Sequence, residues 1–65
     1  MQIRQFEYVK EIAATGSITQ AAQKLFVSQQ ALSEMLKLLE KELGFRIFER
    51  SSRGVKPTKA GEKFL

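Results

Sequence analysis

Hydrophobic residues recur along the first two thirds of the chain at spacings of three and four, the period of an amphipathic helix. This pattern predicts three helices, over residues 4–14, 18–25 and 29–43. The side chains expected to face the core are Ile3, Phe6, Val9, Ile12, Ala13, Ile18, Ala21, Ala22, Leu25, Leu32, Met35, Leu36, Leu39 and Leu43. Because Ala21 and Ala22 are small, the second helix is expected to approach its neighbour closely at a steep crossing angle.

Capping signals mark where these helices begin and end. Ser17 and Gln20 form a capping box, in which the serine oxygen accepts from the backbone N–H of Gln20 and the glutamine reaches back. Ser28 is a second N-cap candidate, and Val27 and Leu32 occupy the two positions of a hydrophobic staple around it. Glycine follows the first and third helices, where a left-handed C-terminal cap favours it, at Gly16 and Gly44. Two short helices joined by such a tight turn form a helix-turn-helix, whose second helix fits the DNA major groove.

The rest of the chain predicts a small hairpin followed by a last helix. Residues 46–50 are rich in strand formers, residues 51–54 form a turn cluster, and residues 55–56 return as a second strand. Pro57 ends that strand because it has no N–H to donate. Thr58 is then the N-cap of a helix that runs to the final residue. Since basic residues lie near its tip, the hairpin is a candidate wing.

The net charge of +4 lies entirely in the last third of the chain. Residues 1–43 carry five basic and five acidic side chains, whereas residues 44–65 carry six basic and two acidic ones. Basic charge gathered in one segment beside a helix-turn-helix indicates a polyanionic partner. For a charge run taken alone, a solvated surface is the simpler interpretation.

Length and composition exclude several classes of function. A chain of 65 residues forms one domain with a small core. It contains no Cys and no His, which removes disulfides, zinc-finger ligands, thiol nucleophiles and the commonest general base. No apolar run approaches the roughly 20 residues that span a bilayer, and the amphipathic, acid-containing N-terminus is not a signal peptide. We therefore expect no metal, no cofactor, no membrane partner and no enzymatic activity.

Three segments in a fixed order carry a likeness to a known family: AAQKLFVSQQALS, LEKELGFRIFER and TKAGE. Over nearly its whole length, the chain resembles the N-terminal DNA-binding domain of the LysR-type transcriptional regulators. The resemblance implies a mainly α, winged helix-turn-helix fold with a three-helix core, a two-stranded wing and the start of a linker helix. The helix-turn-helix would cover about residues 18–37 and the wing about 46–56. Both would lie in a DNA-binding domain over residues 1–57, followed by a linker or dimerisation helix over 58–65.

The resemblance also implies a function and partners. Members of the family bind double-stranded DNA sequence-specifically, with the recognition helix in the major groove and the wing on the backbone or minor groove. They are usually several times longer, carry an effector-sensing domain beyond the linker helix, and bind DNA as dimers and tetramers. We expect this chain to be a mostly monomeric domain of a longer, cytoplasmic and nucleoid-associated regulator whose effector binds elsewhere.

Candidate contact residues follow from the same resemblance. The positions similar to the family's base-reading residues lie near the start of the third helix, at Gln29, Gln30, Ser33 and Glu34. Proline is usual where Gln30 stands, and arginine or lysine is common where Glu34 stands. The candidates for backbone or minor-groove contact are Ser28, Arg50, Ser52, Arg53, Lys56 and Thr58. Glutamine pairs bidentately with adenine, and Arg53 on a projecting turn suits a narrow minor groove.

Two other interpretations of these residues remain open at the level of the sequence. Gln29 and Gln30 could be solvent-exposed helix formers and Ser33 a neutral surface position. The whole chain could also be a winged-helix module whose basic wing binds an acidic protein. DNA binding differs from protein binding in predicting a linear fall of log affinity with log salt, with a slope of about −0.9 per phosphate neutralised.

Overall fold

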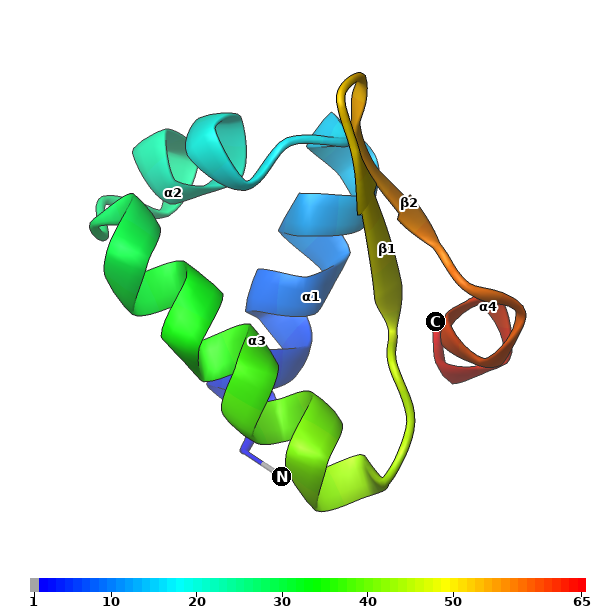
Figure 1. Cartoon of the computed structure of the whole chain (residues 1–65). Coiled ribbons are helices and arrows are strands. Elements are labelled where there is room, and N and C mark those ends of the chain that lie inside the picture. The colour runs from blue at the N-terminus through cyan, green and yellow to red at the C-terminus, as the bar shows by residue number, and fades with distance from the viewer. Residues whose placement is uncertain (1) are drawn as a thin grey trace.

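The computed structural model describes residues 2–65, so Met1 of the predicted domain 1–57 lies outside the described residues. These residues form four helices and a two-stranded antiparallel sheet: α1 (Ile3–Thr15), α2 (Ile18–Leu25), α3 (Gln29–Leu43), β1 (Phe48–Ser51), β2 (Gly54–Pro57) and α4 (Lys59–Phe64). In Figure 1, α3 crosses in front of α1, α2 lies across their upper ends, and the β1–β2 hairpin stands beside them with α4 near its base. The predicted mainly α, winged helix-turn-helix fold is confirmed.

The predicted caps hold the helices of the helix-turn-helix at the expected residues. The bounds of α2 and α3 agree with the prediction, and α1 is one residue longer at each end. Ser17 Oγ accepts from the N–H of Gln20 at 3.2 Å, and Ser28 Oγ accepts from the N–H of Ala31 at 3.0 Å. The reciprocal half of the predicted capping box is wrong, because the Ser17 N–H donates to Thr15 Oγ1 at 3.3 Å. Both expected C-cap glycines are left-handed, with φ of 68° and 82°.

The core lies where the three long helices meet the start of the hairpin. Its buried members are Val9, Ile12, Ile18, Ala21, Ala22, Leu32, Leu36, Leu39, Ile47 and Phe48. The helix stripes therefore face inward as predicted, except at Ile3, which is 82% exposed. Ile3 is the first residue of α1, one turn before Phe6, whose ring packs edge-on against Phe64. The apolar stripe of α1 is therefore covered by other parts of the domain only from Phe6 onward.

The hairpin begins two residues later than predicted. Strand β1 starts at Phe48 rather than Arg46. The reason is a carboxylate on α3, since Glu40 Oε2 accepts from the N–H of Ile47 at 2.7 Å and from that of Phe48 at 3.1 Å. The amides of the last residue before β1 and of its first residue are thus bonded to α3, and these bonds fix the start of the wing against the third helix.

The turn of the hairpin is shorter than predicted. Ser51 pairs with Gly54 in the ladder, so only Ser52 and Arg53 form the turn. Strand β2 includes Pro57, which lies opposite Phe48 at the end of the register. A proline is tolerated there because its missing N–H falls at the limit of the ladder.

Two close backbone approaches fix the hairpin on the helices. The N–H of Val55 donates to the carbonyl of Gly16 at 3.0 Å, which joins β2 to the turn between α1 and α2. Gly54 has φ of 121°, and a Cβ there would lie 2.4 Å from the same carbonyl oxygen. A side chain at this position would push the turn end of the hairpin away from the turn between α1 and α2.

Helix α4 packs on the same core. The N–H of Thr58 donates to the carbonyl of Ile47 at 2.9 Å, and Thr58 Oγ1 caps α4 by accepting from the N–H of Gly61 at 2.9 Å. A Cβ at Gly61 would lie 2.0 Å from the carbonyl oxygen of Ile47. Because α4 packs so closely on Ile47, the residues after Pro57 belong to the same packed unit as the three-helix core. The predicted domain boundary at this point stays a prediction.

Candidate nucleic-acid interface

The first two turns of α3 have one buried side and one exposed side. Leu32 and Leu36 are 1% and 2% exposed and fix the helix on the core. The opposite side carries the four residues predicted to read bases: Gln29, Gln30 and Glu34, which are exposed, and Ser33, which is half-buried. Their side chains can donate and accept hydrogen bonds along one helix face, as reading a base edge requires.

The turn before α3 sets the angle of this face. Phe26 is left-handed, with φ of 58°, and its N–H donates to the carbonyls of Ala22 and Gln23 at the end of α2. The N–H of Val27 also donates to the carbonyl of Ala22, at 3.1 Å. Val27 packs against the cluster that contains Leu32, as expected for a hydrophobic staple. The start of α3 is therefore held by backbone bonds to α2 as well as by side-chain packing.

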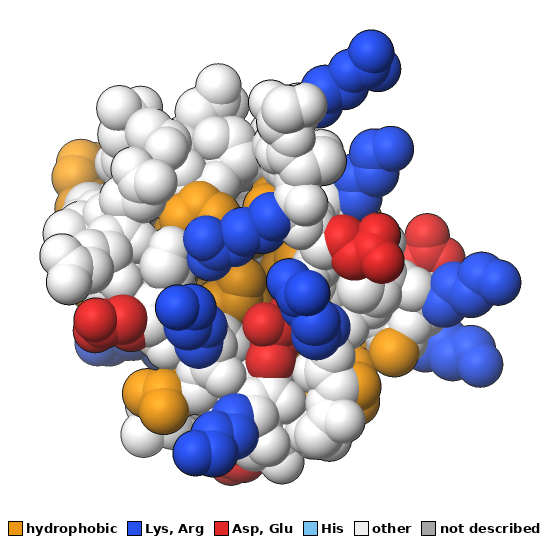
Figure 2. Space-filling view, in the orientation of Figure 1, with side chains coloured by type: hydrophobic (Ala, Val, Ile, Leu, Met, Phe, Trp, Pro, Cys, Tyr) orange, Lys and Arg blue, Asp and Glu red, His pale blue; other side chains and the backbone are white. Residues whose placement is uncertain are grey.

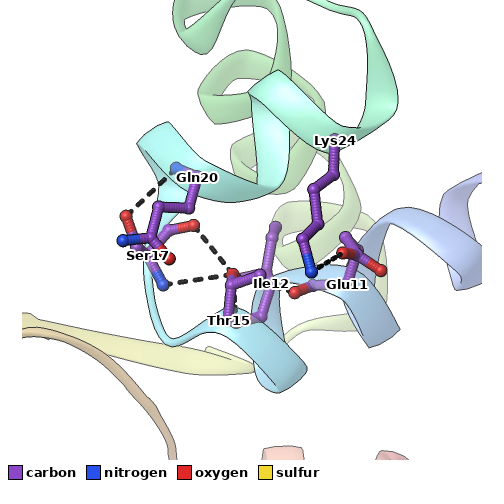
Figure 3. A network of polar contacts seen from close by, with 6 residues as sticks. All are labelled: Glu11, Ile12, Thr15, Ser17, Gln20 and Lys24. Carbon is purple, nitrogen blue, oxygen red and sulfur yellow. Dashed lines mark hydrogen bonds and ion pairs between the residues drawn. The ribbon is translucent and has the colours of Figure 1, made fainter.

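Polar contacts at the junction of α1 and α2 hold α2 in place against α1 (Figure 3). Thr15 Oγ1 lies 2.9 Å from the carbonyl oxygen of Glu11 and 3.0 Å from that of Ser17. Lys24 Nζ lies 3.7 Å from Glu11 Oε1 and ties the far end of α2 to α1. Because the lysine side chain is 68% exposed, this ion pair contributes little to stability. The threonine network and the core positions of Ile18 and Ala21 carry the placement of α2.

The wing presents its basic residues from two sides of the hairpin. Ser52 and Arg53 lie at the exposed tip, where the N–H of Arg53 donates to Ser51 Oγ at 3.3 Å. Arg50 reaches the other way, toward α3, and its Nη2 donates to Ser33 Oγ at 3.3 Å. Lys56 is exposed on β2, opposite Glu49 in the register. The wing thus brings one predicted backbone contact, Arg50, against one predicted base contact.

Thr58 differs from the other predicted backbone contacts because its hydroxyl is already engaged. It donates to the carbonyl of Arg46 and accepts from the N–H of Gly61. A phosphate that took this proton would have to replace the bond to Arg46. The structure gives Thr58 a capping role, and a direct phosphate contact by it stays a prediction.

Charge and uncharged polarity occupy different parts of one face. Figure 2 shows Lys and Arg side chains along α3, between α3 and the hairpin, and out at the hairpin tip. The side chains over α2 and the start of α3, at the upper left of the same view, are mostly uncharged. Uncharged polar groups suit base edges and cations suit phosphates, so this division matches the two kinds of DNA contact.

Metal-ligand clusters and membrane-spanning helices are both absent from residues 2–65. The described residues contain no group of three or more His, Cys, Asp or Glu side chains arranged to hold a metal ion. None of their helices has the length and apolarity that crossing a membrane requires.

The family model described as the bacterial regulatory helix-turn-helix protein of the lysR family matches residues 3–62. The chain belongs to the LysR family. Among its LysR-type relatives, the transcriptional regulator TfdT of Cupriavidus pinatubonensis is 42% identical over 65 residues, which are 100% of this chain and 28% of TfdT. The uncharacterised regulator YcgK of Bacillus subtilis is 43% identical over 65 residues, or 20% of its own length. The chain thus spans less than a third of these curated relatives.

Solved LysR-type structures agree with the fold in detail. The chain superposes on a CbnR DNA-binding domain crystallised with DNA at a TM-score of 0.94, with 40% identity over 100% of this chain and 75% of that one. For a BenM DNA-binding domain in complex with benA site 1 DNA, the TM-score is 0.93, with 41% identity over 98% of this chain and 72% of that one. The LysR-type resemblance seen in the sequence is confirmed.

Three features of the LysR-type site had no signal in the sequence. Glu40 looks like an ordinary solvated charge of an amphipathic helix, although its carboxylate fixes the start of the wing. Gly54 reads as a turn residue, although its missing side chain lets β2 touch Gly16. The bond between Arg50 and Ser33 joins residues 17 positions apart on different elements, so neither position alone suggests it.

Proposed function

We propose that this chain binds double-stranded DNA sequence-specifically, as the DNA-binding domain of a bacterial LysR-type transcriptional regulator. The observation that carries the proposal is the exposed polar face at the start of α3 beside a basic wing, on a fold that superposes at a TM-score of 0.94 on a domain crystallised with DNA. The curated relatives are transcriptional regulators, and the proposal needs no catalytic residue. Its DNA would be the bacterial chromosome, so it would act in the cytoplasm at the nucleoid.

In this proposal the recognition helix α3 lies in the major groove. Gln29, Gln30, Ser33 and Glu34 are the base-reading candidates, and a glutamine paired bidentately with adenine supplies sequence choice. Ser28 caps the helix, whose free N–H groups and dipole favour a phosphate at this end.

The wing supplies affinity from the backbone or the minor groove. Arg53 and Ser52, exposed at the tip, would reach the minor groove, which attracts arginine where it is narrow. Lys56, Arg50 and Thr58 are the remaining candidates for phosphate contact. In the complete regulator, two copies would bind half-sites about one DNA turn or a multiple of it apart. The effector would bind outside these 65 residues.

The proposal is tested by titrating the chain with a selected DNA site and a scrambled site at several salt concentrations. Gln29→Ala should reduce the discrimination between the two sites by about 1–3 kcal/mol if its contact is bidentate. Arg53→Ala should weaken both sites more evenly and make the slope of log affinity against log salt shallower by about 1.

The same titration separates this proposal from the alternative of an acidic protein partner. Equal affinity for selected and scrambled DNA by the unaltered chain would overturn sequence-specific binding. An unchanged affinity ratio for Gln29→Ala would remove Gln29 from the base-reading set and leave DNA binding itself intact.

A further inference from the structure

The alternation of strand β1 aims Arg50 at the recognition helix. Side chains two residues apart in a strand lie on the same face, so Arg50 shares a face with Phe48, which is 1% exposed in the core. Arg50 therefore extends past the edge of the core along the face that is turned toward α3. Its Nη2 donates to Ser33 Oγ at 3.3 Å.

This bond constrains the serine hydroxyl. A hydroxyl has one proton to donate and two lone pairs that accept, whereas a guanidinium only donates. With Arg50 occupying a lone pair, the Ser33 proton has to point away from the guanidinium. Helix serines often donate to the carbonyl four residues before them, but residues 2–65 show no such bond for Ser33. The proton has no acceptor among residues 2–65 and is available to a ligand.

We propose, on the basis of the DNA-binding function above, that Arg50 is a positioning residue that makes Ser33 a hydrogen-bond donor toward DNA. The base edge facing Ser33 would then present an acceptor, which in the major groove is guanine O6 or N7, adenine N7 or thymine O4. The amino groups of cytosine and adenine are donors and would find only the second lone pair of the hydroxyl, beside the guanidinium charge, so they would be disfavoured there. Arg50 thus contributes to sequence choice through a residue on another element, in addition to any attraction that its charge exerts on phosphate.

The test is a double-substitution cycle on randomised half-sites. Binding-site selection with Ser33→Ala first identifies the base pair whose preference depends on Ser33. Arg50→Ala should reduce the preference at that same base pair by about three- to tenfold, in the lower part of the range found for residues in direct contact. The Ser33→Ala, Arg50→Ala double variant should lose no further preference there. Arg53→Ala removes the same charge from the wing tip and should leave the preference at that base pair unchanged while lowering affinity for all sites.

Several results would overturn the inference. Preference at the Ser33 base pair could survive Arg50→Ala, the losses of the two single variants could add, or Ser33→Ala could change no position at all. Each of these leaves DNA binding standing if the unaltered chain still prefers its selected site. Absence of any preference in the unaltered chain would instead overturn the proposed function, and the inference with it.

A measurement without DNA checks the underlying contact. Arg50→Ala should shift the NMR resonances of the Ser33 amide and Cβ in the free protein, whereas Arg53→Ala should not. An unperturbed Ser33 in Arg50→Ala would contradict the positioning role. Because both side chains lie at the surface, the melting temperature should change little, so that a change in base preference cannot come from unfolding.

Discussion

The ring of Phe26 is 94% exposed and stands on a left-handed backbone, with φ of 58° and ψ of 40°. A left-handed conformation costs an ordinary residue roughly 1–2 kcal/mol, whereas asparagine adopts it more readily. Since the exposed ring has little packing to lose, Phe26→Asn should raise the free energy of unfolding by about 0.5–1.5 kcal/mol. Urea denaturation measures the change.

A second exposed apolar residue provides the control for Phe26. Leu38 is 65% exposed and lies within α3, where the backbone is regular. Leu38→Asn removes a comparable apolar side chain but puts a weaker helix former inside a helix, which costs up to roughly 0.7 kcal/mol. Opposite signs for the two substitutions would attribute the gain to the left-handed turn. A loss of stability in Phe26→Asn would mean that the contacts of the Phe26 ring stabilise the fold by more than the left-handed backbone costs.

Glu34 places a carboxylate on the exposed side of α3, beside Ser33. If α3 docks in the major groove, this charge lies near phosphates and lowers affinity. Glu34→Arg should therefore bind DNA more tightly, with a steeper salt dependence and less selectivity. Glu7→Arg makes the same change in net charge on α1, behind α3 in Figure 1, and should have a smaller effect. Equal effects of the two variants at low salt would indicate that Glu34 points away from DNA.

The hairpin depends on a close approach between two glycines. A Cβ at Gly54 would lie 2.4 Å from the carbonyl oxygen of Gly16, which also accepts from the N–H of Val55. Gly54→Ala should lower the free energy of unfolding, because the clash adds roughly 1–3 kcal/mol to the cost of an alanine at positive φ. It should also speed hydrogen exchange at the Val55 amide as β2 separates from the α1–α2 turn.

Gly44 is the matched control for this prediction. Its φ is 82°, and a Cβ built there would meet nothing within 4 Å. Gly44→Ala thus reports the cost of an alanine at positive φ without a clash, and the difference between the two variants reports the contact with Gly16 together with the extra cost of the larger φ of 121° at Gly54. Equal losses of stability, with an unchanged exchange rate at Val55, would mean that the hairpin can shift without cost.

The helices were predictable because the signals for them are local. Each cap is set by residues no more than four positions apart, as at Ser17 and Ser28, and the apolar period is visible within single helices. The hairpin was predicted only coarsely. Its start is fixed by Glu40, seven residues before Ile47 and on another element. Single-sequence patterns contain no information on such a contact.

The candidate site divides in the same way. The exposed face of α3 follows from the helix period, and assigning it to base reading required the family resemblance. The bond from Arg50 to Ser33 and the engaged hydroxyl of Thr58 depend on how the hairpin and α4 pack. These tertiary contacts decide which predicted residues are free to act and which already have a structural partner.

At the scale of the whole molecule, little apolar surface is available for self-association. Phe64 packs edge-on against Phe6 and Phe45, with ring centroids 6.0 and 6.3 Å apart, so α4 uses its aromatic residue inside the domain. Among residues 2–65, the exposed large apolar side chains are Ile3, Phe26, Leu38 and Leu65, which lie on α1, on the turn before α3, on α3 and at the end of α4. Burying one such side chain contributes about 1.5–3 kcal/mol, whereas association costs an estimated 4–15 kcal/mol.

We therefore expect these 65 residues to be mostly monomeric in dilute solution and to bind a single half-site weakly. Helix α4 has only six residues, and helices shorter than roughly 12–15 residues are marginal in water without tertiary packing. A pair of α4 helices would have Leu65 as its main exposed apolar contact, which does not offset the cost of association. Sedimentation equilibrium at micromolar concentration measures the state directly. A stable dimer at that concentration would contradict the expectation. If Ile3→Ser weakened this dimer and Leu65→Ser did not, the dimer contact would lie on α1.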